Sequence, residues 1–146
     1  MEVILIAAVT ADGFIARHSH ETIDWSEDLN VFKKQTMGFP VIVGSNTFKN
    51  MPNSLVGRKT IVVHRNDVPD QIISKLKSAK CFIAGGGITN TRFAPFLTHL
   101  YLTFHPYIFG KGVPLFVGLK SEFKLSLELT IPIKNGITQF QYRIIH

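Results

Sequence analysis

The chain has 146 residues, 45% of them hydrophobic and 18% charged, and a formal net charge of +6. This length suits one domain with one sizeable core, and the apolar fraction is too high for a disordered chain. No apolar run approaches the ~20 residues of a membrane-spanning helix. We therefore expect a single domain over residues 1–146 and no contact with a membrane.

The only cysteine, Cys81, lies in an apolar stretch and cannot form an internal disulfide, which is typical of a reducing compartment. The apolar run at residues 3–9 follows Glu2 and lacks the basic segment and cleavage site of a signal peptide. The sequence therefore predicts a buried first strand and a cytoplasmic protein.

The basic excess of sixteen Lys and Arg over ten Asp and Glu suits anionic ligands, including phosphates, carboxylates and nucleic acids. The basic residues are scattered, however, and aromatic residues do not interleave with them as in RNA-stacking surfaces. We therefore do not expect a nucleic-acid partner. A non-catalytic protein that binds an anionic ligand or nucleic acid is kept as an alternative from another functional class.

Apolar runs of strand length alternate with helical patterns, which is typical of a largely parallel sheet with crossover helices. In chain order we expect a strand at 3–9, a helix at 27–37, a strand at 41–43, a short helix near Thr47, a strand at 59–63, a helix at 69–78, a strand at 82–84, a helix at 89–94 and a strand at 100–104.

The first helix has the clearest end signals. Asp24 and Ser26 are candidate N-caps, and acidic residues precede basic ones along the segment, as the helix dipole favours. Leu29, Phe32 and Thr36 follow at helical spacing, so we expect them to share one face of this helix.

Near the C-terminus the pattern changes to strict alternation at residues 123–129 and again at 139–144. Asn135 and Gly136 lie between these segments and suit a tight turn, so we expect an antiparallel hairpin of half-buried strands. The predicted fold class is α/β, with a mainly parallel central sheet, helices on both faces and this hairpin at one edge.

Gly85, Gly86 and Gly87 close a buried strand and open a helix. Backbone N–H groups without side chains can approach a pyrophosphate, whose charge a helix N-terminus favours. The spacing differs from G-x-G-x-x-G, so the ordinary dinucleotide fingerprint is absent. A tight strand–helix turn is the alternative, but three consecutive glycines exceed what a turn needs.

Few other residues suggest chemistry. Asp28 is either a solvated acid near a helix start or a carboxylate aimed into a cleft, and its position alone favours the first reading. The six histidines lack the spacing of zinc ligands, so we expect no metal. No Gly-x-Ser-x-Gly elbow occurs, and Cys81 falls within a strand, which leaves little support for a nucleophilic mechanism.

Several segments together resemble the dihydrofolate reductase family and its relative, the reductase domain of riboflavin biosynthesis. The segments are Ile6-Ala7-Ala8, Asp12 to Ala16, Trp25, Asp28-Leu29-x-x-Phe32-Lys33-x-x-Thr36, Pro40 to Gly44 with Thr47, Leu55-x-Gly57-Arg58-Lys59, Gly85 to Gly87, and Leu100 to Thr103. Each segment is short, but their order and spacing along most of the chain are specific.

The resemblance implies a dihydrofolate-reductase-like fold and an oxidoreductase that reduces 7,8-dihydrofolate to tetrahydrofolate with NADPH, in one-carbon metabolism. It implies that Asp28 is the catalytic acid of the pterin site and that Thr103 supports it. The implied substrate-binding residues are Ile6, Ala7, Ala8, Phe32 and Arg58. The implied cofactor-binding residues are Ala8, Ile15, Gly44, Ser45, Thr47, His64, Arg65, Gly85, Gly86 and Gly87.

Four departures from the dihydrofolate reductase pattern keep a second enzyme reading open. Ser45 replaces an arginine expected to contact phosphate, a role that His64 and Arg65 could take over. Asn90 replaces a tyrosine, and the spacing from Trp25 to Asp28 is short. The segment 106–116, with Gly-Lys in place of Gly-Asp, resembles the riboflavin-type reductases.

The second reading is reduction of the ribose of 5-amino-6-(5-phosphoribosylamino)uracil, as in the C-terminal domain of the bifunctional riboflavin enzyme. Both readings imply NADPH and a small-molecule substrate, either a pterin or a pyrimidine. The sequence leaves a homodimer open.

Overall fold

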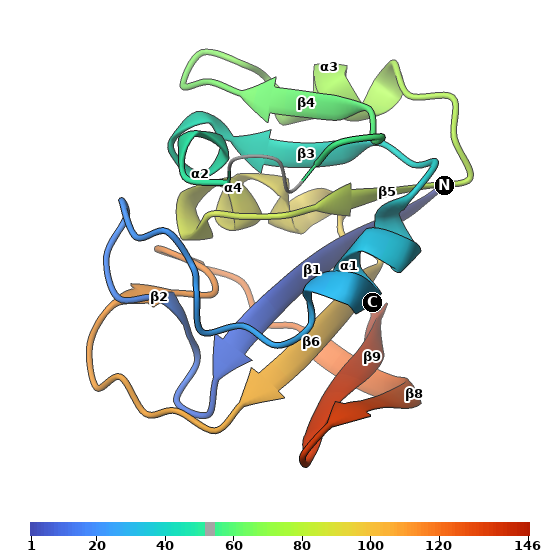
Figure 1. Cartoon of the computed structure of the whole chain (residues 1–146). Helices are drawn as coiled ribbons and strands as arrows, with labels where there is room; N and C mark the ends of the chain where they lie inside the picture. Colours follow the sequence, from blue (N-terminus) through green and yellow to red (C-terminus); the bar gives the residue numbers. More distant parts are fainter. Residues whose placement is uncertain (52–54) are drawn as a thin grey trace.

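The computed structural model describes residues 1–51 and 55–146. A seven-stranded sheet in the order β4-β3-β5-β1-β6-β9-β8 forms the centre, and a small two-stranded sheet, β2-β7, lies beside it (Figure 1). The first five strands of the large sheet are parallel, and β9 and β8 join it antiparallel. The predicted α/β class and the C-terminal hairpin are therefore confirmed.

The predicted elements occur in the predicted order along the chain, and the structure adds two short strands, β2 and β7, that the sequence analysis did not predict. The strands are β1 (Glu2–Thr10), β2 (Phe14–Ala16), β3 (Val41–Gly44), β4 (Thr60–Val63), β5 (Lys80–Ile83), β6 (His99–His105), β7 (Val113–Pro114), β8 (Lys124–Lys134) and β9 (Ile137–Ile145). The helices are α1 (Leu29–Thr36), α2 (Ser45–Lys49), α3 (Pro69–Ser74) and α4 (Gly87–Phe93), with a 3₁₀ turn, η1, at Ala94–Phe96.

The continuous apolar run of β1 is explained by burial on both sides of the sheet. Val3, Leu5 and Val9 pack into the core on the side of α3 and α4, whereas Ile4 and Ile6 pack on the side of α1. Successive side chains of a strand point to opposite faces, so a strand covered on both faces is apolar at every position.

Helix α1 begins later than predicted. It starts at Leu29, with Asp28 as the N-cap, so neither Asp24 nor Ser26 caps it. The backbone just before the helix is held by a tertiary contact, in which the N–H of Glu27 donates to Nε2 of His105 on β6. Leu29 is also 57% exposed and does not share the burial of Thr36, because it borders an open cavity.

Helix α3 ends at Ser74 instead of residue 78. The chain leaves it through a tight turn in which Leu76 N–H donates to the Ile73 carbonyl, and then enters β5 at Lys80. Helix α4 begins at Gly87, two residues before the predicted start, so the last glycine of the triplet belongs to the helix.

The hairpin of β8 and β9 pairs as predicted, but the predicted half-burial of β8 is wrong. Leu127 and Leu129 are each 51% exposed and Leu125 is 36% exposed. Strand β8 is the edge of the sheet and lies beyond the strands that α1 and α4 cover (Figure 1). Apolar alternation therefore indicated the strand correctly without indicating its burial.

Within residues 1–51 and 55–146, none of the helices has the length and apolar character needed to cross a membrane.

Candidate active site

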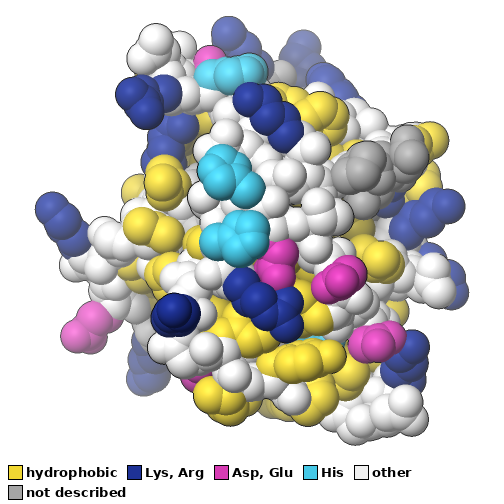
Figure 2. Space-filling view, turned by 60° about the vertical axis from the view of Figure 1, so that its left-hand side comes forward, with side chains coloured by type: hydrophobic (Ala, Val, Ile, Leu, Met, Phe, Trp, Pro, Cys, Tyr) yellow, Lys and Arg dark blue, Asp and Glu magenta, His cyan; other side chains and the backbone are white. Residues whose placement is uncertain are grey.

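A cavity of about 1060 Å³ opens where the parallel strands end, between α1, the segment after β2 and the start of α4. We call it the main cavity. Fourteen of the predicted site residues line it: Ile6, Ala7, Ala8, Ile15, Asp28, Phe32, Gly44, Ser45, Thr47, His64, Arg65, Gly85, Gly86 and Gly87. Figure 2 shows one face of the molecule, with histidine side chains near its centre and top. Lys and Arg side chains lie beside these histidines and around the outline of the molecule. Parallel sheets commonly bind ligands at this edge.

Asp28 lies in the wall of the main cavity and is only 6% exposed. Burial raises the pKa of its carboxyl, and the neighbouring Thr103 hydroxyl opposes that rise without cancelling it. Its side chain makes no capping hydrogen bond to α1, so the carboxylate is not used as a helix cap. A partly desolvated acid in a cavity is suited to bind and protonate a ligand.

Thr103 does not line the main cavity but lies behind Asp28, on β6, with no exposed surface. Its hydroxyl lies near the Asp28 carboxyl and lowers the pKa of that group, but its Oγ1 atom reaches the geometry of a full hydrogen bond with none of the described residues. Buried hydroxyls are nearly always paired in folded proteins. The hydroxyl beside Asp28 is therefore a candidate for pairing with a bound ligand or an ordered water.

Arg58 also lies outside the lining of the main cavity, and it is only 9% exposed. Its Nη1 donates to Thr36 Oγ1 at 3.4 Å, and its guanidinium carbon lies 5.8 Å from the centre of the Phe32 ring. Arg58 is therefore a buried cation and not a solvent-exposed surface residue. These contacts place Arg58 beside Phe32 and Thr36, which follow Asp28 at helical spacing along α1.

The triple glycine forms a backbone floor at the other end of the main cavity. A Cβ on Gly86 would lie 2.9 Å from Thr47 Oγ1, and one on Gly87 would lie 2.6 Å from the Pro114 carbonyl oxygen. Gly85 has a φ of +92°, and the peptide bond between it and Gly86 is cis. The geometry leaves no room for side chains here, so the backbone itself faces the cavity, as a pyrophosphate-binding segment requires.

Two residues of α4 also line the main cavity: Asn90, which the sequence analysis named only as a departure from the family pattern, and Arg92, which it did not name. Asn90 is 1% exposed, donates to the Leu115 carbonyl at 2.8 Å, and has a buried Oδ1 without a partner among the described residues. Arg92 donates to the carbonyls of His64, Arg65 and Asp67. Arg92 thereby ties α4 to the loop after β4, which carries the predicted phosphate contacts. The only feature of the sequence that could have indicated this role is an arginine at helical spacing after the glycines.

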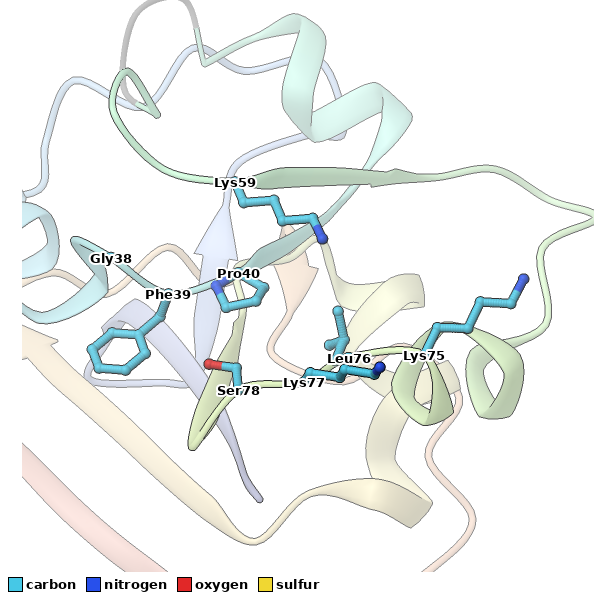
Figure 3. Close-up of a pocket in the computed structure, with 8 residues that line it drawn as sticks. All are labelled: Gly38, Phe39, Pro40, Lys59, Lys75, Leu76, Lys77 and Ser78. Carbon is cyan, nitrogen blue, oxygen red and sulfur yellow. The ribbon is translucent and has the colours of Figure 1, made fainter.

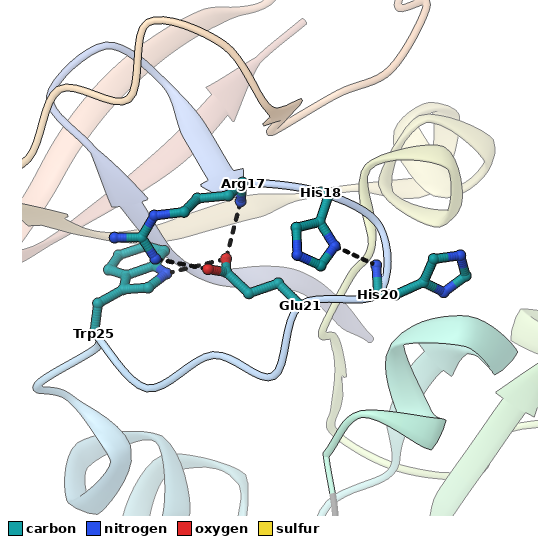
Figure 4. Close-up of polar contacts among 5 residues, drawn as sticks. All are labelled: Arg17, His18, His20, Glu21 and Trp25. Carbon is teal, nitrogen blue, oxygen red and sulfur yellow. Dashed lines mark hydrogen bonds and ion pairs between the residues drawn. The ribbon is translucent and has the colours of Figure 1, made fainter.

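The segment between β2 and α1 closes one side of the main cavity and is held by Glu21 (Figure 4). Glu21 accepts hydrogen bonds from the Arg17 N–H at 2.9 Å, from Arg17 Nη1 at 2.6 Å and from Trp25 Nε1 at 3.4 Å. Burial alone would raise the pKa of Glu21, but these hydrogen bonds lower it below its ordinary value. The carboxylate thus stays charged and fixes the loop.

Comparison with known proteins gives a consistent family. The sequence model described as dihydrofolate reductase matches residues 2–108. Dihydrofolate reductase from Bacillus subtilis is 31% identical over 112 residues, 67% of this chain and 66% of that protein. Dihydrofolate reductase type 3 from Salmonella typhimurium is 31% identical over 118 residues, 71% of this chain and 72% of that protein. The chain belongs to the dihydrofolate reductase family.

Solved structures agree on the fold of this dihydrofolate reductase family member. Dihydrofolate reductase from Enterococcus faecalis, complexed with NADP(H) and RAB-propyl, superposes with a TM-score of 0.72 at 21% identity, covering 98% of this chain and 96% of that one. A putative riboflavin biosynthesis protein from Shewanella sp. PV-4 gives a TM-score of 0.71 at 18% identity, covering 100% of both chains. At these identities the likeness establishes the shared fold and does not separate the two enzymes.

A second hollow of about 450 Å³ lies at the opposite edge of the sheet, between the starts of β3 and β4 and the end of α3 (Figure 3). Lys59, Lys75 and Lys77 line it, and it shares no lining residue with the main cavity. Among the described residues, no group of three or more His, Cys, Asp or Glu side chains is arranged to hold a metal ion.

Cys81 is fully buried in β5, and burial raises the pKa of its thiol to about 11. A thiol with a raised pKa and no access to solvent is unreactive, so it offers no nucleophile.

Proposed function

We propose that this protein reduces 7,8-dihydrofolate to tetrahydrofolate, with NADPH as the hydride donor. The observation that carries the proposal is the pairing, within one cavity, of a buried carboxylate, Asp28, with a side-chain-free backbone floor at Gly85–Gly87. The first feature suits a pterin, and the second suits a dinucleotide. Membership of the dihydrofolate reductase family supports the same reading.

At the substrate end, Asp28 would hold the amino group and ring nitrogen of the pterin through its two carboxylate oxygens. Its raised pKa favours retention of a proton near the ring, which the reduction requires beside the hydride. The Thr103 hydroxyl behind Asp28 would complete this contact, directly or through a water. Arg58 would hold the glutamate carboxylate of the folate tail, which a planar guanidinium suits.

At the cofactor end, the residues that would hold NADPH are the three glycines with Thr47 beneath the pyrophosphate, and His64 with Arg65 at the exposed adenosine end. When bound, this cofactor supplies the hydride. Ser45 carries no charge, so Arg65 would provide the cationic contact to the 2′-phosphate. Gly44, Ala8 and Ile15 line the passage between the two ends.

The walls between these ends are apolar. Ile6, Ala7, Ala8 and Phe32 line the main cavity there, and the Glu21-anchored loop covers its side. Two flat rings must approach closely for hydride transfer, and exclusion of water prevents side reactions. Small side chains at positions 7 and 8 leave room for both rings.

Reduction of the phosphoribosylaminouracil intermediate of riboflavin synthesis is the second candidate, and segment 106–116 favours it. It has the weaker support, because the matching family model and the curated relatives quoted above are dihydrofolate reductases. An anion-binding protein without catalysis would bind NADPH poorly and nucleic acid in a strongly salt-dependent manner. A homodimer and a cytoplasmic location both stay predictions.

The test is an absorbance assay of NADPH oxidation by the purified protein, with dihydrofolate and with the phosphoribosylaminouracil intermediate in parallel. We expect turnover with dihydrofolate at a kcat/KM at least ~100-fold above that for the pyrimidine. Preferred turnover of the pyrimidine would establish the second candidate. If the protein fails to oxidise NADPH with either substrate, both reductase functions are contradicted.

A further inference from the structure

We propose that His105 is a positioning residue for Asp28: its imidazole, in one fixed neutral tautomer, holds the backbone that leads into the carboxylate. The inference rests on the proposed function for its kinetic consequence, but its structural part stands on contacts alone. It concerns a buried imidazole on β6 that the sequence analysis considered only as a metal ligand.

The tautomer follows from the two partners of the ring. His105 is 1% exposed, and its Nδ1 lies 3.0 Å from the Thr103 carbonyl oxygen, which can only accept a hydrogen bond. Its Nε2 lies 2.9 Å from the backbone nitrogen of Glu27, which can only donate. The hydrogen therefore resides on Nδ1, and Nε2 must be unprotonated to accept from Glu27.

This hydrogen bond acts directly before the carboxylate. Asp28 follows Glu27 in the chain and is the N-cap of α1, with no capping bond from its own side chain. The direction of its carboxyl group therefore depends on where the preceding backbone is held. The Glu27 carboxylate also pairs with Lys134 at 2.5 Å, but that pair is about half exposed, and exposed pairs contribute little.

The same strand supplies both partners of Asp28. Thr103 and His105 are two residues apart on β6 and so point to the same face of the sheet. The Thr103 hydroxyl lowers the pKa of the Asp28 carboxyl, and the His105 ring holds the backbone nitrogen of the preceding residue, Glu27. One short strand segment thus fixes the acid from two sides.

The imidazole also joins the acid to the loop that closes the main cavity. Trp25 packs edge-on against His105, with ring centroids 5.3 Å apart at 87°, and against Phe109 at 5.3 Å and 83°. Trp25 in turn donates to Glu21, the residue that fixes the loop (Figure 4). A filler of similar volume would keep this packing but lose the hydrogen bond to Glu27.

Two conservative variants separate these roles. The side-chain amide of His105→Gln can place an acceptor where Nε2 lies, whereas that of His105→Asn reaches only the position of Nδ1. His99→Gln and His99→Asn are matched controls on the same strand, since His99 contacts Glu128 and does not line the main cavity. In each variant we would measure kcat and KM with dihydrofolate, the Kd for NADPH, and NMR hydrogen exchange at the Glu27 amide.

We expect His105→Asn to lower kcat/KM for dihydrofolate by roughly 10- to 100-fold, the cost of a small misplacement of a catalytic group. NADPH affinity should stay within about 2-fold, and the Glu27 amide should exchange at least ~10-fold faster, because its acceptor is lost. His105→Gln should restore activity to within about 3-fold and keep the amide protected. Both His99 variants should behave like the wild type.

Long-range ¹H–¹⁵N spectra of the wild-type protein test the tautomer without any substitution, and a ring protonated on Nε2 or on both nitrogens overturns the proposal. Equal losses in the Gln and Asn variants, or faster Glu27 exchange with unchanged kcat/KM, would overturn it as well. A wild-type protein whose Glu27 amide is protected from exchange as expected, but which does not turn over dihydrofolate, would instead contradict the proposed function. That result would leave His105 as a structural anchor only.

Discussion

The two ends of the main cavity recognise their ligands by opposite means. At the substrate end the polar groups are buried: Asp28, Thr103 and Arg58 are each at most 9% exposed. At the cofactor end the backbone of three glycines faces the cavity, and the side chains of His64 and Arg65 are exposed. Buried polar groups cost free energy unless they are paired, whereas exposed ones do not. Changes at the substrate end should therefore affect chemistry and stability together, and changes at the cofactor end should affect affinity alone.

The largest effect is expected at the buried acid. Asp28→Asn keeps the shape of the side chain but removes the proton-holding carboxyl, so turnover at neutral pH should fall by at least ~100-fold. Part of the loss should be recovered at low pH, where the substrate itself is protonated. Steady-state kinetics across pH measures this effect. The control is Asp24→Asn, which removes the same charge at an exposed position and should keep wild-type rates. Wild-type turnover in Asp28→Asn would remove the acid from the mechanism.

At the cofactor end, Arg65→Ala should weaken NADPH binding by about 1.5–3 kcal/mol, the range for a hydrogen bond to a charged group. NADH lacks the 2′-phosphate and should be little affected. Fluorescence titration with both cofactors measures this, and Lys75→Ala, in the separate basic hollow, controls for the loss of one positive charge. Equal losses for both cofactors would show that Arg65 does not contact the 2′-phosphate.

Arg58→Ala tests whether the buried arginine serves the tail of the substrate. The tail is remote from the hydride, so KM for dihydrofolate should rise ~10- to 100-fold while kcat is largely kept. A dihydropteroate-like substrate without the glutamate should be handled almost equally by the wild type and the variant. Thr36→Val, which removes the hydroxyl that Arg58 contacts, controls for local packing. Similar losses with both substrates would assign Arg58 to the fold instead of to the tail.

The smallest effect concerns stability and runs opposite to activity. Burial raises the pKa of Asp28 in the folded chain above its value in the unfolded chain. The folded state therefore binds the proton more tightly, and stability falls as pH rises from the ordinary Asp range through the raised pKa. Asp28→Asn should remove this cost and raise Tm by about 2–4 °C at pH 7–8, the shift that about 1 kcal/mol gives at this size.

The gain from Asp28→Asn should shrink as pH falls toward the ordinary pKa of aspartate, because the wild-type acid is then neutral as well. Calorimetry at several pH values measures the difference in Tm. A lower Tm for the variant at every pH would mean that the folded state stabilises the charged carboxylate.

The two ends also differ in how well the sequence predicted them. The cofactor end could be predicted from local sequence. A glycine run between a strand and a helix has no side chains, so its backbone is exposed, and Gly85–Gly87 line the cavity as expected. The order of strands and the hairpin followed from periodicity in the same way. Arg92 was missed because its contacts to the loop after β4 are created only by the fold.

At the substrate end the sequence alone left Asp28 as a solvated first-turn acid, and only the family resemblance gave it a role. Its burial arises from β6, seventy-five or more residues further along the chain, through Thr103 and His105. Helix α1 starts at Leu29, after the backbone of Glu27 has been fastened to β6, and the capping signals at Asp24 and Ser26 did not indicate this start. Exposure of β8 likewise depends on its place at the sheet edge.

The most direct test of the account is isotopic. The purified protein is incubated with NADPH deuterated at the transferred position and with dihydrofolate, and the tetrahydrofolate formed is examined by mass spectrometry. We expect tetrahydrofolate carrying one deuterium from the cofactor in the wild type, and at least ~100-fold slower labelling in Asp28→Asn at neutral pH. Unlabelled tetrahydrofolate, no tetrahydrofolate, or equal labelling rates in the two proteins would contradict it.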